Sequence, residues 1–184
     1  MAKSPAIKMA ARLEPLAGEK LANKTVTIEA APAASRISLR GNAKGFEKAL
    51  GFALPKKPKT SASKAGKHAL WIGPDEWMVI DEKNPDTSLI PKTSSKVFAA
   101  ADISHRNAAV IVSGEGAENT LAAGCPQNLS LRTFPKGACS RTVLGKAEVI
   151  IYRTANDTFR VEFWRSFAPY VWTFLSEAAK DAHI

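Results

Sequence analysis

Cysteine and histidine are scarce in this sequence, with two cysteines, Cys125 and Cys139, and three histidines, His68, His105 and His183, among 184 residues. The cysteine spacing matches no zinc or redox motif, and a reducing compartment would keep both as thiols. The histidines are scattered and indicate no metal site. The chain also lacks an apolar run long enough to span a bilayer and the apolar core of a secretory signal. We therefore expect a cytoplasmic chain without a bound metal or a membrane contact.

Acidic residues are few in the first third of the chain, which therefore carries the positive charge. Residues 1–67 contain 14 lysines and arginines against 4 acidic residues, whereas residues 68–184 contain 12 against 13. Much of the excess lies in PKKPKTSASKAGK (55–67), whose composition predicts a mobile, solvated loop. This segment lacks the aromatic side chains that would stack on bases. We expect no nucleic-acid partner, and a basic nucleic-acid-binding module is the second alternative hypothesis.

Short strands and helices are predicted along the rest of the chain. HALWIGPDEWMVID (68–81) predicts a hairpin, because proline and aspartate suit the second and third positions of its turn. Helices are predicted at 42–52, with Asn42 as N-cap, at 115–124, and after Ser166 as N-cap, where apolar side chains recur at helical spacing and Pro169 occupies the first turn. Strands are predicted at 25–30, 35–40, 97–104, 107–113, 140–144, 147–153 and 158–164.

The two halves of the sequence resemble each other. ISLRGNAKGFEKALGFALP and VIVSGEGAENTLAAGCPQNL both run from a strand through a glycine to a short helix and a proline, with Gly41 and Gly114 separated by 73 residues. HALWIGPDEWMVI corresponds to SRTVLGKAEVIIY, with Gly73 and Gly145 separated by 72.

We therefore predict an α+β domain over residues 24–184, preceded by an N-terminal arm (1–23). Its two strand–helix–strand–strand halves cover about 24–83 and 97–180. Two such units sharing one sheet indicate antiparallel strands with helices packed on one face.

ADISHRN (101–107) is the stretch with the most catalytic composition. A Ser-His-Asp triad needs residues that converge from separate elements, whereas Asp102, Ser104 and His105 are nearly consecutive. There is no nucleophile elbow, and Gly114-Glu115-Gly116 lacks the remaining glycine and the lysine of a phosphate loop. We predict that the chain has no catalytic, cofactor-binding or metal-binding residue.

Four tryptophans could suggest a ring-stacking pocket, but their positions fit core packing better. Trp172 differs, because it falls outside the apolar stripe of the last predicted helix. Burying it would require a surface beyond the domain's own sheet, so Trp172 is the best interface candidate.

Five ordered motifs carry a resemblance to a known family: GPDEW, DxSHR, GCPxxL, FPxGxC and RSFAxYxW, together with EPLAG and SLRG near the start. Their combination over most of residues 13–180 resembles the gamma subunit of heterotetrameric sarcosine oxidase. The first dozen residues and the lysine-rich segment match no motif.

The resemblance implies the following expectations. The enzyme demethylates sarcosine oxidatively to glycine, releases hydrogen peroxide and transfers the one-carbon unit to tetrahydrofolate. FAD, FMN, NAD, zinc and tetrahydrofolate are expected in the alpha, beta and delta subunits, which are the expected partners. The gamma chain is expected to be a non-catalytic accessory subunit with a fold similar to the folate-binding domain of aminomethyltransferase-like proteins. Asp102, His105, Arg106 and Trp172 are the interface candidates.

A stand-alone folate-binding protein of the same fold is the first alternative. It needs a carboxylate to hold the pterin, and the sequence nominates Asp102 or Glu162 only loosely.

Overall fold

The computed structural model describes residues 13–84 and 98–182. The strands are β1 (Lys20–Ala22), β2 (Thr27–Ala30), β3 (Ser35–Gly41), β4 (Ser61–Lys64), β5 (Lys67–Gly73), β6 (Glu76–Asp81), β7 (Phe98–Asp102), β8 (Asn107–Ser113), β9 (Cys139–Leu144), β10 (Ala147–Ala155) and β11 (Thr158–Trp164). The helices are α1 (Ala43–Leu50), α2 (Ala117–Ala122) and α3 (Ala168–Asp181), with a 3-10 turn, η1 (Arg165–Phe167), before α3. None of these helices is both long and apolar enough to cross a membrane.

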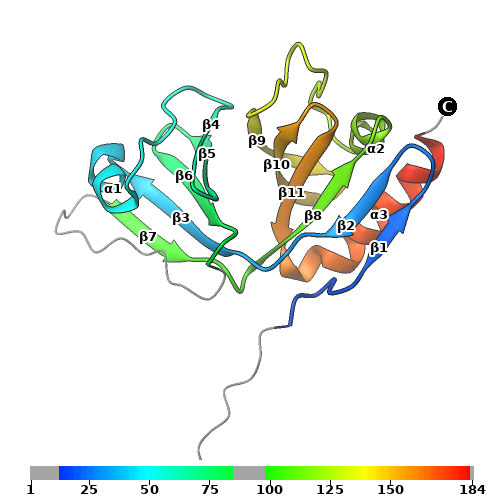
Figure 1. The fold of residues 1–184 in the computed structure, drawn as a ribbon, viewed down its shortest axis with the longest axis horizontal. Helices are drawn as coiled ribbons and strands as arrows, with labels where there is room; N and C mark the ends of the chain where they lie inside the picture. Colours follow the sequence, from blue (N-terminus) through cyan, green and yellow to red (C-terminus); the bar gives the residue numbers. More distant parts are fainter. Residues whose placement is uncertain (1–12, 85–97, 183–184) are drawn as a thin grey trace, which may run out of the picture.

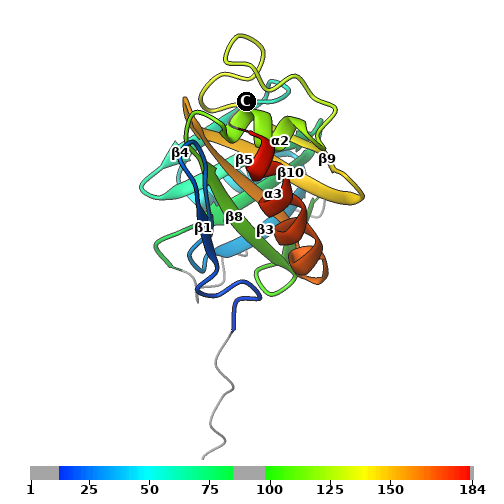
Figure 2. The same cartoon turned by 90° about the vertical axis from the view of Figure 1, so that its right-hand side faces the viewer.

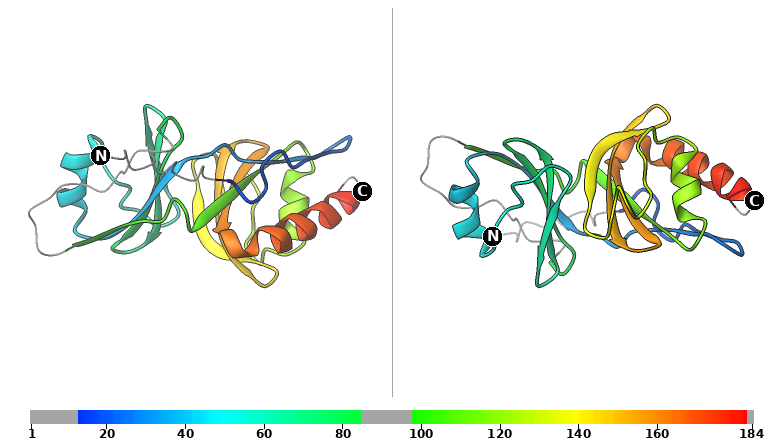
Figure 3. Two further views of the ribbon diagram at one scale, coloured as in Figure 1. Left: turned by 90° about the horizontal axis from the view of Figure 1, so that it is seen from below. Right: turned by 90° about the horizontal axis from the view of Figure 1, so that it is seen from above.

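The strands form two antiparallel sheets. The five-stranded sheet has the order β4-β5-β6-β3-β7, and the six-stranded sheet has the order β1-β2-β8-β11-β10-β9. The two sheets pack against each other at the centre, with α1 on the outer side of the first sheet and α2 and α3 on the outer side of the second (Figure 1). Figure 2 shows α2 and α3 on the outer face of the six-stranded sheet, and Figure 3 shows α1 and α3 at opposite ends of the molecule. The prediction that both halves share one sheet is therefore wrong, although the antiparallel α+β class is confirmed.

The internal repeat is visible in the strand order. In the first half β3 pairs with the last strand of the β4-β5-β6 meander, and in the second half β8 pairs with the last strand of β9-β10-β11. Gly41 and Gly114, which end β3 and follow β8, both have positive φ (128° and 106°), a conformation that favours glycine. The order corrects the sequence alignment, because β5–β6 corresponds to β10–β11 and β4 is the counterpart of β9.

The halves also exchange a strand. β2 comes before β3 in the chain but pairs with β8, while β7 comes before β8 but pairs with β3. The two connections between the sheets therefore lie together, and the Ile103 N–H donates to the Arg36 carbonyl at 2.9 Å. Neither sheet can complete its strand order without the other half of the chain.

Successive side chains of a strand point to opposite faces of its sheet. The buried side chains therefore form three cores, one beneath the helices of each sheet and one between the two sheets. In β6, Trp77 and Val79 pack beneath α1, whereas Met78 and Ile80 point toward the other sheet. In β10, Ile151 packs beneath α2 and α3, and the neighbouring Tyr152 points toward the five-stranded sheet. Each sheet consequently buries both of its faces.

Several local predictions are confirmed. Asn42 caps α1 by accepting the Lys44 N–H at 3.0 Å, and Gly51 ends the helix with φ of 77°. The hairpin around Gly73 forms as β5–β6. Pro169 occupies the first turn of α3, but η1 intervenes, so Phe167 is the N-cap residue and the prediction of Ser166 is wrong.

Two segments are more ordered than the sequence indicates. Residues 55–67 were expected to form a loop throughout, but residues 61–64 form β4, whose pairing with β5 gives these polar residues their strand geometry. In the N-terminal arm, β1 extends the six-stranded sheet and Leu16 is buried in its core. Residues 1–12 of the arm lie outside the described residues.

Candidate functional site

Three of the predicted interface residues lie together: Asp102 ends β7, and His105 and Arg106 lie in the turn between β7 and β8. The Asp102 carboxylate accepts the Ser104 N–H at 2.8 Å, and the buried Ser104 hydroxyl accepts the Arg36 N–H at 2.8 Å. His105 and Arg106 are exposed, whereas Ser104 is buried. Asp102 and Ser104 thus fix a connection between the two sheets, and with the exposed His105 they do not form a triad.

A surface groove adjoins this turn. Arg106 lies over the ring of Trp164, with 4.5 Å between the guanidinium carbon and the ring centroid, and Trp164 contacts Phe167 at 6.3 Å between centroids. The Arg165 N–H donates to the Arg106 carbonyl at 2.7 Å and joins the β7–β8 turn to η1. We call this site the Arg–Trp groove; it is lined by Pro15, His105, Arg106, Trp164, Arg165, Ser166 and Pro169.

The structure places Trp172 differently from the groove. Trp172 is half-buried against the core of the six-stranded sheet and does not line the groove. Trp164 is 41% exposed, although the sequence analysis placed it in the core. Phe159, Val161 and Phe163 point toward the helices, whereas Trp164 lies on the face of β11 that also carries the buried Arg160 and Glu162, and it is exposed as the last residue of the strand.

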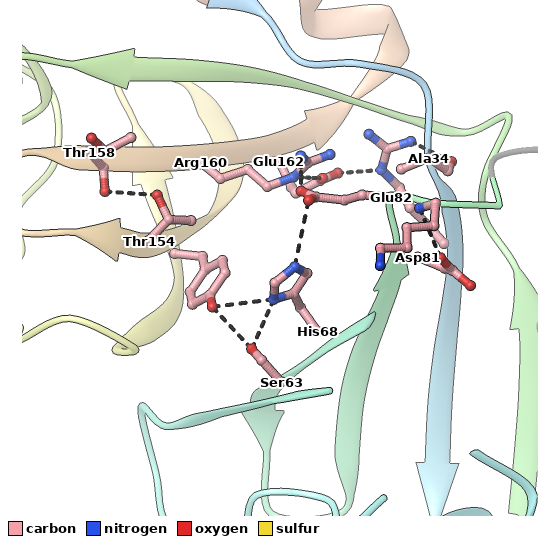
Figure 4. A network of polar contacts seen from close by, with 12 residues as sticks. Ala34, Ser63, His68, Asp81, Glu82, Thr154, Thr158, Arg160 and Glu162 are labelled. Atoms are coloured by element: carbon pink, nitrogen blue, oxygen red, sulfur yellow. Dashed lines mark hydrogen bonds and ion pairs between the residues drawn. The ribbon is translucent and has the colours of Figure 1, made fainter. Parts of the chain in front are cut away.

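An ionic cluster lies between the two sheets; its members are Arg36, His68, Glu82, Arg160 and Glu162 (Figure 4). The two Glu162 oxygens accept from Arg36 Nε at 2.6 Å and from Arg160 Nε at 2.7 Å. Arg160 also pairs with Glu82 at 2.8 Å, and His68 lies 3.6 Å from Glu82. The cluster connects β3, β5 and the end of β6 with β11.

Burial determines the electrostatics of the ionic cluster. The side chains of Glu162 and Arg36 are 0% and 1% exposed. Burial alone would raise the pKa of Glu162, but the guanidinium groups of Arg36 and Arg160 outweigh burial and hold it below its usual range. The His68 ring is the main cause that lowers the pKa of Glu82, and Arg160 adds to this effect against partial burial. Both carboxylates are therefore ionised at neutral pH.

The cluster has the properties of a structural clamp. Both Glu162 oxygens are engaged by arginines, so this carboxylate is not available for pterin binding, and one oxygen of the exposed Asp102 accepts the Ser104 N–H. The neighbouring inter-sheet space is filled by Leu70, Met78 and Ile80, which are fully buried. These residues do not fit a folate ligand at the centre of the fold.

The cysteines are placed for packing. The Cys139 thiol donates to the Thr60 carbonyl at 3.2 Å, and burial raises its pKa to about 12. Cys125 is buried beneath the six-stranded sheet. A nucleophilic cysteine needs an accessible thiolate, so Cys139 is unsuited to that role. Within residues 13–84 and 98–182, no group of His, Cys, Asp or Glu is arranged to hold a metal ion.

Comparison with known proteins identifies relatives of this architecture. The family described as "Sarcosine oxidase, gamma subunit family" matches residues 39–181. The chain is 27% identical to the sarcosine oxidase subunit gamma of Corynebacterium sp. (strain U-96), over 97% of this chain and 90% of the relative. It is 28% identical to the sarcosine oxidase subunit gamma of Arthrobacter sp., over 61% of this chain and 57% of that protein.

Solved structures show the same relationship. A chain of the heterotetrameric sarcosine oxidase from Corynebacterium sp. U-96 superposes with a TM-score of 0.82 at 25% identity, covering 94% of this chain and 97% of that one. The glycine cleavage system aminomethyltransferase T from Bartonella henselae superposes with a TM-score of 0.63 at 16% identity, covering 82% and 45%. The second match shows a shared fold.

Proposed function

The chain belongs to the sarcosine oxidase gamma subunit family, and we propose that it works as an accessory, non-catalytic subunit that stabilises the assembled enzyme. The observation that carries the proposal is the match along nearly the whole length of both chains to one component of a heterotetrameric sarcosine oxidase. A chain of this kind contributes to the oxidoreductase through its contacts.

The geometry of the polar residues supports an accessory role. The buried Glu162 is paired with Arg36 across the two sheets and with Arg160 on its own strand, and Arg160 is paired with Glu82 of the other sheet. Ser104, the only candidate nucleophile of the Asp-Ser-His sequence, is bonded to backbone atoms of Arg36. These groups position the sheets and leave the chemistry to other subunits.

The partners follow from the same proposal. Other sarcosine oxidase subunits are the partners, and we take them to be alpha, beta and delta chains in the cytoplasm. In this proposal they hold the FAD, FMN, NAD, zinc and tetrahydrofolate used to demethylate sarcosine and pass on the one-carbon unit. The gamma chain would then bind none of these groups.

Coexpression tests this function. The other three subunits are produced with and without this chain, and the yield of assembled enzyme, its flavin content and its sarcosine-dependent release of hydrogen peroxide are measured. We expect assembly and flavin content to fall without the chain, and supplying it in trans to restore both. Equal assembly, flavin content and turnover in its absence would refute the proposal.

A further inference from the structure

The Arg–Trp groove combines cations with exposed apolar surface. Leu13 and Trp164 are among the few large apolar residues of the described chain with high exposure, at 72% and 41%. The Arg165 guanidinium donates to the Leu13 carbonyl, which places the residues before β1 beside η1. The β7–β8 turn, the start of α3 and the residues before β1 meet at the lower edge of the molecule in Figure 1.

The positive charge of the groove is local. Residues 68–184 contain slightly more acidic than basic residues, yet the groove is lined by His105, Arg106 and Arg165 and by no acidic side chain. In the part of the chain that the structure describes, neither Arg106 nor Arg165 has a carboxylate within ion-pair distance. The nearby Asp102 is engaged with the Ser104 N–H.

The arrangement is suited to binding a protein. Stacking on Trp164 limits the rotamers of Arg106, which lowers the entropy cost of pairing it with a carboxylate. Tryptophan and arginine are also the residues on which interface affinity most often depends. The backbone hydrogen bond from the Arg165 N–H to the Arg106 carbonyl holds the β7–β8 turn beside η1, so the two arginines lie close together.

We propose that the Arg–Trp groove docks an acidic segment of a partner subunit of sarcosine oxidase, with a carboxylate on Arg106 or Arg165 and an aliphatic side chain against Leu13 and Trp164. Charge complementarity selects this occupant, because a basic, partly apolar groove without acidic side chains favours an acidic, partly apolar segment. The inference rests on the proposed function, since it takes the partner from the same enzyme.

Affinity of the full-length chain for the complex of its partner subunits tests the proposal. Arg106→Glu is expected to weaken binding on the order of 100-fold, and Arg106→Gln on the order of 10-fold. Trp164→Ala should weaken it by about 10-fold or more. Lys44→Glu, which makes the same charge change on the exposed face of α1, is the matched control and should bind like the wild type. Raising the salt concentration should lower the affinity of the wild-type chain for the partner subunits more than it lowers the affinity of Arg106→Gln.

The outcomes separate this inference from the proposed function. Failure of the wild-type chain to bind any partner subunit would overturn both. Normal wild-type binding, with Arg106→Glu indistinguishable from Lys44→Glu, would overturn the docking site alone. Sedimentation of the isolated chain is the second measurement, and a wild-type dimer that Arg106→Glu converts to a monomer would assign the groove to a second copy of the chain instead.

Discussion

The two halves of the molecule have the same strand order but unequal cores. Among the described residues, 24 buried residues form the core between the six-stranded sheet and its helices, and 8 form the core between the five-stranded sheet and α1. The larger core is covered by α2, the 14-residue α3 and the N-terminal segment with Leu16. The smaller one is covered mainly by the short helix α1.

The difference shows how the first half depends on the second. A core of eight side chains stabilises a sheet poorly by itself, because buried apolar area must offset the entropy cost of ordering the chain. The five-stranded sheet gains its remaining buried area from the inter-sheet face, through Leu70, Met78 and Ile80. The ionic cluster then fixes one alignment of the sheets, because Arg36 pairs with Glu162, and Glu82 with Arg160, only in that alignment.

Removing the Glu162 carboxylate, which lies at the centre of the ionic cluster, should destabilise the packing of the two sheets more than any other change proposed below. Glu162→Ala leaves the buried guanidinium groups of Arg36 and Arg160 without their shared partner, and we expect a loss of about 3–5 kcal/mol in the free energy of unfolding. Urea denaturation of the full-length chain measures the loss. Glu29→Gln, which breaks an exposed pair with Lys20 in the same sheet, is the control and should change stability by less than about 1 kcal/mol. Equal effects of the two variants would show that the cluster does not hold the sheets together.

A matched pair of leucines compares the two cores directly. Leu39 and Leu175 are both fully buried, one beneath α1 and the other in α3, and each substitution by alanine should cost about 2–5 kcal/mol. Amide hydrogen exchange locates the loss. We expect Leu39→Ala to lower protection in β3–β6 and α1 alone, because the larger core does not need the smaller one.

Leu175→Ala should behave differently and lower protection in both halves, since the five-stranded sheet loses its support when the six-stranded sheet opens. A uniform loss of protection in both variants would mean that the halves unfold as one unit. That result would contradict the dependence of the first half on the second.

Much of the secondary structure could be predicted from the sequence, because it depends on periodic patterns, whereas the unequal cores were not predicted. The apolar spacing along 167–178 predicted the long helix, and the glycine-centred repeat predicted two equivalent halves. β4 was missed because Ser61–Lys64 carries no apolar alternation and obtains its strand geometry by pairing with β5. The two-sheet arrangement was missed because period two does not reveal what covers the second face of a strand.

The functional surface was predictable in part. Asp102, His105 and Arg106 were named as interface candidates within and just after a strand predicted at 97–104, and the structure ends β7 at Asp102 and places His105 and Arg106 in the Arg–Trp groove. Trp164 was not predicted to line this groove, because strands rich in aromatic residues usually indicate core. The ionic cluster was invisible, because Arg36, Glu82 and Glu162 are far apart in sequence and are brought together only by the packing of the sheets.

Acid should weaken the contact between the halves by a smaller amount. The pKa of Glu82 is lowered in the folded chain, so its contribution is present above the ordinary glutamate pKa of about 4.3 and is lost as the pH falls through the lower folded value. Glu82 is partly exposed, and solvent screening limits this contribution to less than about 1 kcal/mol. Thermal unfolding of the wild type and Glu82→Gln should therefore differ near neutral pH and converge in acid. Parallel pH profiles would contradict the role of Glu82.

The smallest expected effect is a change in the rate at which Cys139 is alkylated, and this rate reports directly on separation of the two sheets. Cys139 lies between them, where its thiol contacts the Thr60 and Trp71 carbonyls, whereas Cys125 lies beneath the six-stranded sheet. With a pKa of about 12, Cys139 is about one part in ten thousand thiolate at pH 8, so iodoacetamide should leave it unmodified in the native chain. In Glu162→Ala we expect Cys139 to be alkylated faster than Cys125, as followed by mass spectrometry of the two peptides. If both cysteines are modified at the same rate, the two sheets separate only when the whole chain unfolds. The two halves would then be equally stable despite their unequal cores.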